Sequence, residues 1–143
     1  MSIDNVKQRF INEIKLRAYD DKFVDKAEER EILQIAIQQN LSVDSARQAL
    51  AQVCEQLGYV LESTVIGKIK DNIDAAMGND GKMDEKEFQM IFASAKKAFN
   101  GKKNDVQIKR AILEIMEDTG NTKVKTGWFS DWYTRVKREV GMA

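Results

Sequence analysis

The stretch that decides the fold is Asp25-Lys26-Ala27-Glu28, which returns 59 residues later as Asp84-Glu85-Lys86-Glu87. An aspartate followed three positions later by a glutamate, just before an apolar run, is typical of a capping box at the start of a helix. A short acidic turn precedes the cap in both copies, and apolar residues at helical spacing follow it. The pattern therefore predicts the same turn and the same helix twice in one chain.

The helices on either side of these caps repeat as well. The helix before the turn matches at the same offset of 59, in the pairs Val6 and Val65, Phe10 and Ile69, Ile14 and Ile73, and Ala18 and Met77. Leu16 and Ala18 are alternatives for the last inward position of that helix. The third helix matches at an offset of 62, and a glycine closes each copy, Gly58 or Gly120. We place the three inserted residues in the stretch 100–103.

A further helix is predicted at the C-terminal end of the chain. After Gly127, aromatic and apolar residues follow the spacing of one helix face: Trp128, Phe129, Trp132, Tyr133, Val136 and Val140. The chain contains no proline, so long helices with short connections are expected throughout. We predict a single all-α domain over residues 1–143 with about seven helices. It comprises two pseudo-symmetric three-helix units, residues 1–58 and 62–120, and an aromatic helix over residues 128–140.

The composition argues against an enzyme. The chain has no histidine and only one cysteine, Cys54, so it lacks the commonest general base and every Cys–His nucleophile pair or zinc site. Lys and Arg number 23, as do Asp and Glu, so the net charge does not favour nucleic acid or a membrane surface. No apolar run is long enough to span a bilayer, and no secretion signal is recognisable. We expect a cytoplasmic protein without membrane insertion.

The second acidic turn resembles half of a calcium-binding loop. With Gly81 at the sixth position of an EF-hand, the later ligand positions fall on Asp80, Asp84 and Glu87. The first and third positions hold residues without a side-chain oxygen, and in the first copy the leading position is Arg17, whose charge repels a cation. The favoured interpretation is that these acids cap helices or lie in solvent. The alternative is a degenerate site for Ca²⁺ or Mg²⁺ on Asp80, Asp84 and Glu87.

A family resemblance rests on the same motifs. The stretch 79–88 has the pattern DG-K-apolar-D-x-x-E-apolar, and the stretch 25–33 is followed by Leu41-Ser42-Val43-Asp44. These motifs resemble those of the tellurite-resistance TerB-like proteins, over roughly residues 15–120. The resemblance implies a small cytoplasmic helical protein with an internal pseudo-twofold axis. It also implies a link to stress responses and metal binding through acidic residues.

The aromatic tail has two interpretations of its own. Its side chains either close the core of the two repeats, or leave a tryptophan exposed as the anchor of a protein interface. In the second case Trp128, Trp132 and the neighbouring Arg135 form the predicted partner-binding site. We therefore expect a non-catalytic binding or adaptor protein without a resident cofactor, acting through protein–protein contacts. The alternatives are a divalent-cation sensor and a metal-dependent carboxylate hydrolase at the acidic turn.

Overall fold

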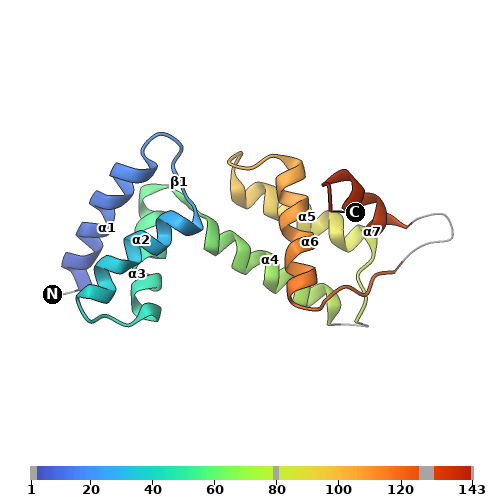
Figure 1. The fold of residues 1–143 in the computed structure, drawn as a ribbon, viewed down its shortest axis with the longest axis horizontal. Coiled ribbons are helices and arrows are strands. Elements are labelled where there is room, and N and C mark those ends of the chain that lie inside the picture. The colour runs from blue at the N-terminus through green and yellow to red at the C-terminus, as the bar shows by residue number, and fades with distance from the viewer. Residues whose placement is uncertain (1–2, 79–80, 126–130, 143) are drawn as a thin grey trace. The chain divides into compact units, whose positions relative to one another are not determined.

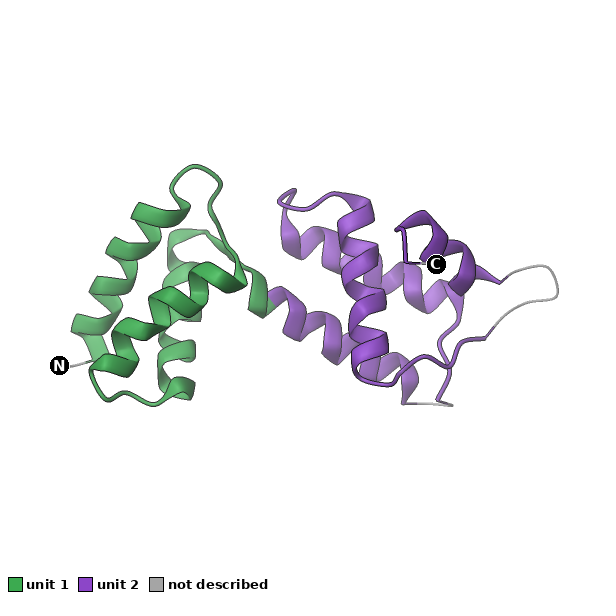
Figure 2. Ribbon diagram, viewed as in Figure 1, with its two compact units in different colours: residues 1–64 green, residues 65–143 purple. Residues whose placement is uncertain are grey.

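The computed structural model describes residues 3–78, 81–125 and 131–142, and helices make up most of them (Figure 1). The elements follow the order α1 (Ile3–Ala18), β1 (Phe23–Val24), α2 (Lys26–Gln38), α3 (Val43–Leu57), β2 (Val60–Leu61), α4 (Glu62–Met77), α5 (Glu85–Phe99), α6 (Asp105–Asp118) and α7 (Trp132–Glu139). This confirms the all-α prediction. The chain divides into two compact units, residues 1–64 and 65–143 (Figure 2). No helix in the described ranges has both the length and the apolar character needed to cross a bilayer.

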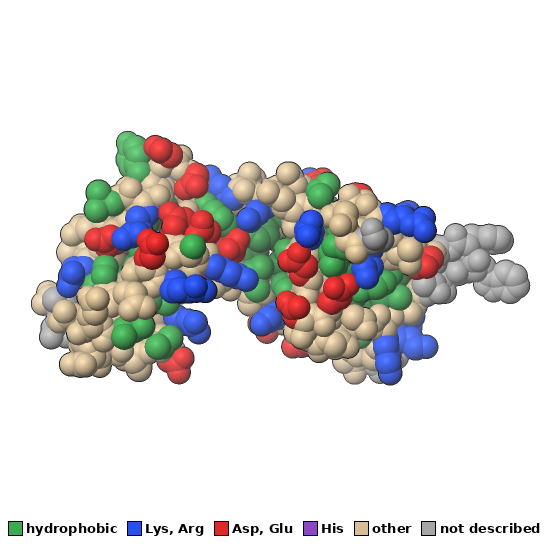
Figure 3. Space-filling view, in the orientation of Figure 1, with side chains coloured by type: hydrophobic (Ala, Val, Ile, Leu, Met, Phe, Trp, Pro, Cys, Tyr) green, Lys and Arg blue, Asp and Glu red, His purple; other side chains and the backbone are tan. Residues whose placement is uncertain are grey.

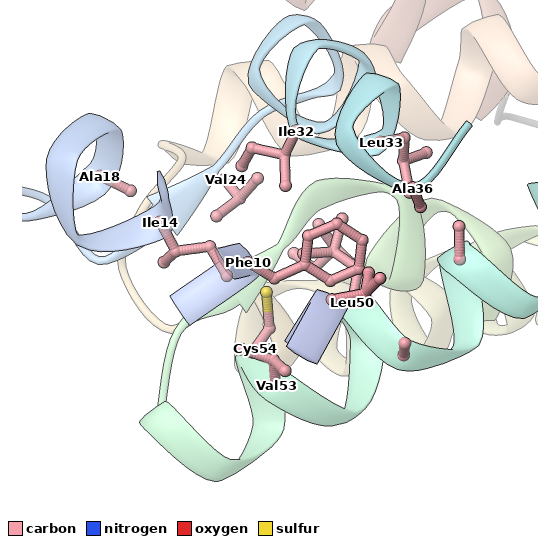
Figure 4. Packing of buried hydrophobic residues seen from close by; sticks show 14 residues of the cluster. Phe10, Ile14, Ala18, Val24, Ile32, Leu33, Ala36, Leu50, Val53 and Cys54 are labelled. Carbon is pink, nitrogen blue, oxygen red and sulfur yellow. The ribbon is translucent and has the colours of Figure 1, made fainter. Parts of the chain in front are cut away.

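Unit 1, residues 1–64, packs α1, α2 and α3 around one hydrophobic core. Phe10 and Ile14 of α1 meet Ile32 of α2 and Leu50 of α3 in this core, where all four side chains are inaccessible to solvent (Figure 4). A two-residue parallel pair joins β1 to β2 beside the core. Two-residue strands carry no periodic signal, so the sequence did not predict this pair.

The helix starts follow from local side-chain chemistry. In the first turn of α2, the Asp25 carboxylate accepts the backbone N–H of Glu28, and the Glu28 carboxylate accepts that of Asp25. Asp84 and Glu87 form the same reciprocal pair at the start of α5. Each pair satisfies two of the donors that a helix N-terminus leaves without a partner. Both predicted capping boxes are therefore confirmed.

Unit 2, residues 65–143, contains the remainder of α4 together with α5, α6 and α7. Its largest fully buried side chains include Phe88 and Phe99 of α5, Ile112 of α6 and Trp132 of α7. A single parallel bridge between Met83 and Val124 takes the place that the β1–β2 pair holds in unit 1. α7 begins at Trp132, with Asp131 as its N-cap, so the predicted start at residue 128 is wrong by four residues.

The three helices of unit 1 recur in order as α4, α5 and α6, and α7 has no counterpart among the described elements of unit 1. The bounds of α1 recur in α4 after 59 residues, and the start of α3 recurs in α6 after 62. Gly58 is the C-cap of α3, and Gly120 follows the C-cap of α6. Both adopt the left-handed conformation, with φ of 74° and 75°. The three inserted residues are shared: α5 is two residues longer than α2, and the loop after it is one residue longer. The prediction that placed all three in the loop is therefore partly wrong.

The first turn of α4 belongs to unit 1 and is bonded to α2. The Glu62 carboxylate accepts the backbone N–H of Lys26 at 3.2 Å, and the Ser63 hydroxyl donates to the Glu29 carboxylate at 3.0 Å. Glu29 is the one buried charged residue in the described part of the chain, with 7% of its surface exposed. The same position in unit 2 is Phe88. Unit 1 therefore uses a hydrogen bond from α4 where unit 2 packs an aromatic ring.

Candidate protein-binding surface

Two features recur after α1 and α4, a hydrogen bond back to the helix end and a residue in the left-handed region. Lys22 donates its N–H to the carbonyl of Ala18, and Gly81 donates its N–H to that of Met77, both at 2.8 Å. Lys22 has a φ of 53° and Gly81 a φ of 73°, so each lies in the left-handed region. Glycine adopts this region without steric cost, whereas lysine does not. The hydrogen bond and the left-handed residue therefore recur in both units, although one unit has lysine at this position and the other has glycine.

Two of the three predicted cation ligands, Asp84 and Glu87, form the capping box of α5. One oxygen of Asp84 bonds the backbone of Glu87 at 2.7 Å, and one oxygen of Glu87 bonds the backbone of Asp84 at 3.1 Å. Asp80 lies outside the described residues. Within the ranges that the structure describes, no three Asp, Glu, Cys or His side chains gather closely enough to hold a metal ion. The geometry supports a capping role for Asp84 and Glu87, and cation binding at this turn stays a prediction.

The corresponding acids of unit 1 crowd one another. Burial raises the pKa of the Glu28 carboxyl above its ordinary value, although the hydrogen bond from the Asp25 backbone lowers it. The negative charges of Asp25 and Asp21 raise the pKa of Glu28 further. Like charges raise a carboxyl pKa in this way only when they are close. Asp21, Asp25 and Glu28 therefore lie close to one another at the turn after α1.

The described part of the aromatic tail places Trp132 in the core of unit 2, which corrects the prediction that Trp132 anchors a partner. Only 1% of the Trp132 surface is exposed, and its indole N–H donates to the carbonyl of Lys125 at 2.8 Å. Its ring packs against Phe88 at a centroid distance of 5.1 Å. The exposed Arg135 is bonded to Glu85. Trp128, the third residue of the predicted site, lies outside the described residues.

Cys54 has the environment of an inert core thiol, as its helical spacing predicts. It is 2% exposed, and burial together with the nearby charge of Glu29 raises its pKa to about 12. A thiol with so high a pKa carries almost no thiolate near neutrality, and the thiolate is the nucleophile. The structure thus gives Cys54 no nucleophilic character near neutral pH.

The most exposed apolar side chains lie together at the end of α1. Leu16, in the last turn of α1, is 79% exposed, and Tyr19, the first residue after the helix, is 72% exposed. Ala18 is buried, so the structure selects Ala18 over Leu16 for the inward position. Figure 3 shows hydrophobic side chains beside acidic ones at the turn that follows α1, at the upper left. We call Leu16 and Tyr19 the α1 apolar pair.

Unit 2 serves as an internal comparison for this pair. At the offset of 59, Leu16 corresponds to Ala75 and Tyr19 to Gly78. α4 has the same length as α1, and its last residue accepts the corresponding hydrogen bond, so the fold does not require large apolar side chains at these positions. Large exposed apolar side chains that the fold does not need are a mark of interaction sites when they are contiguous.

The two units have opposite formal charges, which the zero net charge of the whole chain conceals. Residues 1–64 carry eight Lys and Arg against eleven Asp and Glu, a net charge of −3. Residues 65–143 carry fifteen Lys and Arg against twelve Asp and Glu, a net charge of +3. The α1 apolar pair therefore lies on the acidic unit. A count by unit would have found this signal in the sequence.

Comparison with protein-family models, with curated proteins and with solved structures found no match for this chain.

Proposed function

We propose that the chain is a non-catalytic cytoplasmic protein-binding module of TerB-like type, and that unit 1 carries its contact surface. The observation that carries the proposal is the exposure of Leu16 and Tyr19, at 79% and 72%, where the same helix of unit 2 has Ala75 and Gly78. Exposed apolar side chains release water on association, and tyrosine is enriched among the residues that contribute most to binding.

The surroundings of the α1 apolar pair define the chemistry of the partner. Asp20 and Asp21 follow Tyr19 directly, and Arg17 is held between Glu13 and Glu31 in a cluster with one excess negative charge. Electrostatic complementarity favours a partner with basic side chains around an apolar centre. A basic amphipathic helix presents that combination on one face.

The buried cysteine supports the cytoplasmic location, and the motif resemblance supports the TerB-like type. The lone Cys54 is buried and unbridged, as is usual in a reducing compartment. The TerB-like resemblance rests on the two capping motifs and adds a link to stress responses. The alternative cation-sensor function requires Asp80, Asp84 and Glu87 to bind metal together.

A labelled peptide tests the proposed function directly. The probe is a synthetic amphipathic helix with leucine on one face and lysine on the other, compared with a version in which glutamate replaces lysine. We expect fluorescence anisotropy to show saturable binding of the lysine peptide only, in the presence of a chelator. The Leu16→Ala/Tyr19→Ala variant should weaken binding at least tenfold, whereas Val43→Ala, a control at another exposed apolar position, should not.

Two results would contradict this proposal. One is equal binding of both peptides, or binding that the double variant leaves unchanged. The other is binding that occurs only with millimolar calcium or magnesium and is lost in Asp80→Ala/Glu87→Ala, which would establish the cation-sensor function instead.

A further inference from the structure

The exposed face of α5 in unit 2 has the chemistry that the α1 apolar pair requires. Met90 is 65% exposed, and Ala93 and Ser94 are exposed beside it. Lys86 and Lys97 lie four residues before and seven after Met90, so both belong to the same helix face. We call Lys86, Met90, Ala93, Ser94 and Lys97 the α5 basic face.

The acidic residues of α5 are already engaged elsewhere. Glu85 is bonded to Arg135 of α7, and the Glu87 carboxylate accepts the backbone N–H of Asp84. The exposed positions of α5 between Lys86 and Lys97 include no acid. This face therefore combines an apolar centre with positive charge at both ends.

The internal repeat shows that the fold does not need this face either. At the offset of 59, Met90 corresponds to Glu31, Ala93 to Gln34 and Lys97 to Gln38. Unit 1 thus has an acid and two amides on α2 where unit 2 has apolar and basic residues on α5. The exposed Leu16 and Tyr19 of unit 1 and Met90 of unit 2 thus have no large apolar residue at the matching position of the other unit, and the formal charges of the two units are opposite.

We propose that the α1 apolar pair of one copy docks on the α5 basic face of a second copy of this chain. The inference rests on the proposed function and names its partner. The acids around Tyr19, with the net charge of −3 on unit 1, are complementary to Lys86, Lys97 and the net charge of +3 on unit 2. Leu16 and Tyr19 then bury their exposed surface against Met90 and Ala93.

The contact joins two different surfaces, so it is heterologous. Each copy offers both surfaces, and such a contact either closes into a ring or continues into a chain. Because charge contributes to it, association weakens as the salt concentration rises. This distinguishes it from a twofold contact between two α1 apolar pairs, which would bring like charges together.

Sedimentation velocity on the full chain tests the proposal with two surface variants. Leu16→Ser/Tyr19→Ser removes the α1 apolar pair, and Met90→Ser/Lys97→Glu removes the α5 basic face. The wild type should show a mass that rises with concentration and falls at high salt. Each variant alone should remain monomeric. An equimolar mixture of the two variants should form dimers and nothing larger, because only one complementary pair of surfaces remains.

Other outcomes overturn the inference in recognisable ways. A wild type that stays monomeric up to its solubility limit overturns self-association. If binding of the lysine peptide still depends on Leu16 and Tyr19, the proposed function is retained and the partner is another protein. If the Met90→Ser/Lys97→Glu variant still associates while Leu16→Ser/Tyr19→Ser does not, the pair contacts something other than α5. Circular dichroism checks folding, which exposed substitutions should leave nearly unchanged.

Discussion

Lys22 and Gly81 show how one backbone conformation can be reached by two residue types. Both lie in the left-handed region and donate the same hydrogen bond to the helix before the turn. For a residue with a side chain this conformation costs about 1–2 kcal/mol, whereas glycine incurs a conformational-entropy cost of about 0.5–1 kcal/mol. The balance at this position therefore favours glycine slightly.

Exchanging the residue types at this turn should move stability in opposite directions. We expect Gly81→Ala to lower the free energy of unfolding by about 1 kcal/mol and Lys22→Gly to raise it by up to about 1 kcal/mol. Urea denaturation followed by circular dichroism measures both. A loss of stability in Lys22→Gly would mean that the lysine side chain makes a contribution larger than its backbone strain.

The raised pKa of the Cys54 thiol predicts how the free energy of unfolding changes in alkali. Its pKa is about 12 in the folded chain, against an ordinary value of 9.0. Above pH 9 the thiol ionises in the unfolded chain but not in the folded one. Ionisation therefore stabilises the unfolded state relative to the folded state. The free energy of unfolding should therefore fall between about pH 9 and 12, where the folded thiol finally ionises.

The variant Cys54→Ala isolates this effect from other groups that titrate in alkali. Its stability should differ from that of the wild type by a constant amount below pH 9, and the difference should then shift in favour of the variant. Glu29→Gln should reduce the effect, because the charge of Glu29 contributes to the raised pKa of Cys54. A difference that stays constant up to pH 12 would contradict the assigned pKa.

At the scale of elements, the capping boxes of α2 and α5 explain why both helices begin where they do. Replacing an N-cap aspartate by alanine typically costs about 1 kcal/mol, whereas asparagine keeps the side-chain acceptor. We expect Asp25→Ala and Asp84→Ala each to lower the free energy of unfolding by about that amount. Asp25→Asn and Asp84→Asn should remain close to the wild type in the same urea titrations.

A stability loss in Asp84→Asn as large as that in Asp84→Ala would show that the negative charge itself is required. That result would mean that the carboxylate also stabilises α5 through its charge at the positive end of the helix dipole. Thermal unfolding with added calcium tests the cation-sensor function directly, since an ion bound only to the folded state raises the stability of that state.

The elements that the sequence predicted are those with a local cause. The capping boxes at Asp25 and Asp84, and the apolar spacing of α1 to α6, depend on residues within a few positions of one another. The β1–β2 pair and the Met83–Val124 bridge join segments distant in the sequence and were not predicted. The start of α7 was placed too early because the aromatic spacing continues through residues 128 and 129, before its N-cap at Asp131.

The candidate site was less predictable than the fold. Spacing alone places Trp132 on an apolar face but does not say whether another element covers that face; Phe88 and Lys125 do so here. Leu16 and Ala18 were both compatible with the pattern of α1, and only the packing shows that Leu16 is the exposed one. An exposed apolar residue is recognised by the contacts that it lacks in the folded chain.

At the scale of the whole molecule, the two units have their own buried side chains. Trp132 is buried in unit 2, and truncation of a buried tryptophan typically costs about 3–5 kcal/mol. We expect Trp132→Ala to accelerate amide hydrogen exchange in α5, α6 and α7 and to leave α1, α2 and α3 protected. Mass spectrometry of peptic fragments resolves the two sets of helices.

Val106→Ala is the control, because it removes an exposed apolar side chain of unit 2 instead of a buried one and lies outside the proposed contact surfaces. It should change exchange in neither unit. If Trp132→Ala accelerated amide hydrogen exchange equally throughout the chain, the two units would unfold as one cooperative body.

The bonds from Glu62 and Ser63 to α2 have a consequence for how the gene can be divided. The second repeat begins at Glu62, yet its first two residues complete the first repeat. A gene fragment cut at the repeat boundary would encode every helix of unit 1 and still leave the buried Glu29 without its hydroxyl donor. Recombination between the repeats would meet the same obstacle, because the first repeat depends on side chains that the second repeat supplies.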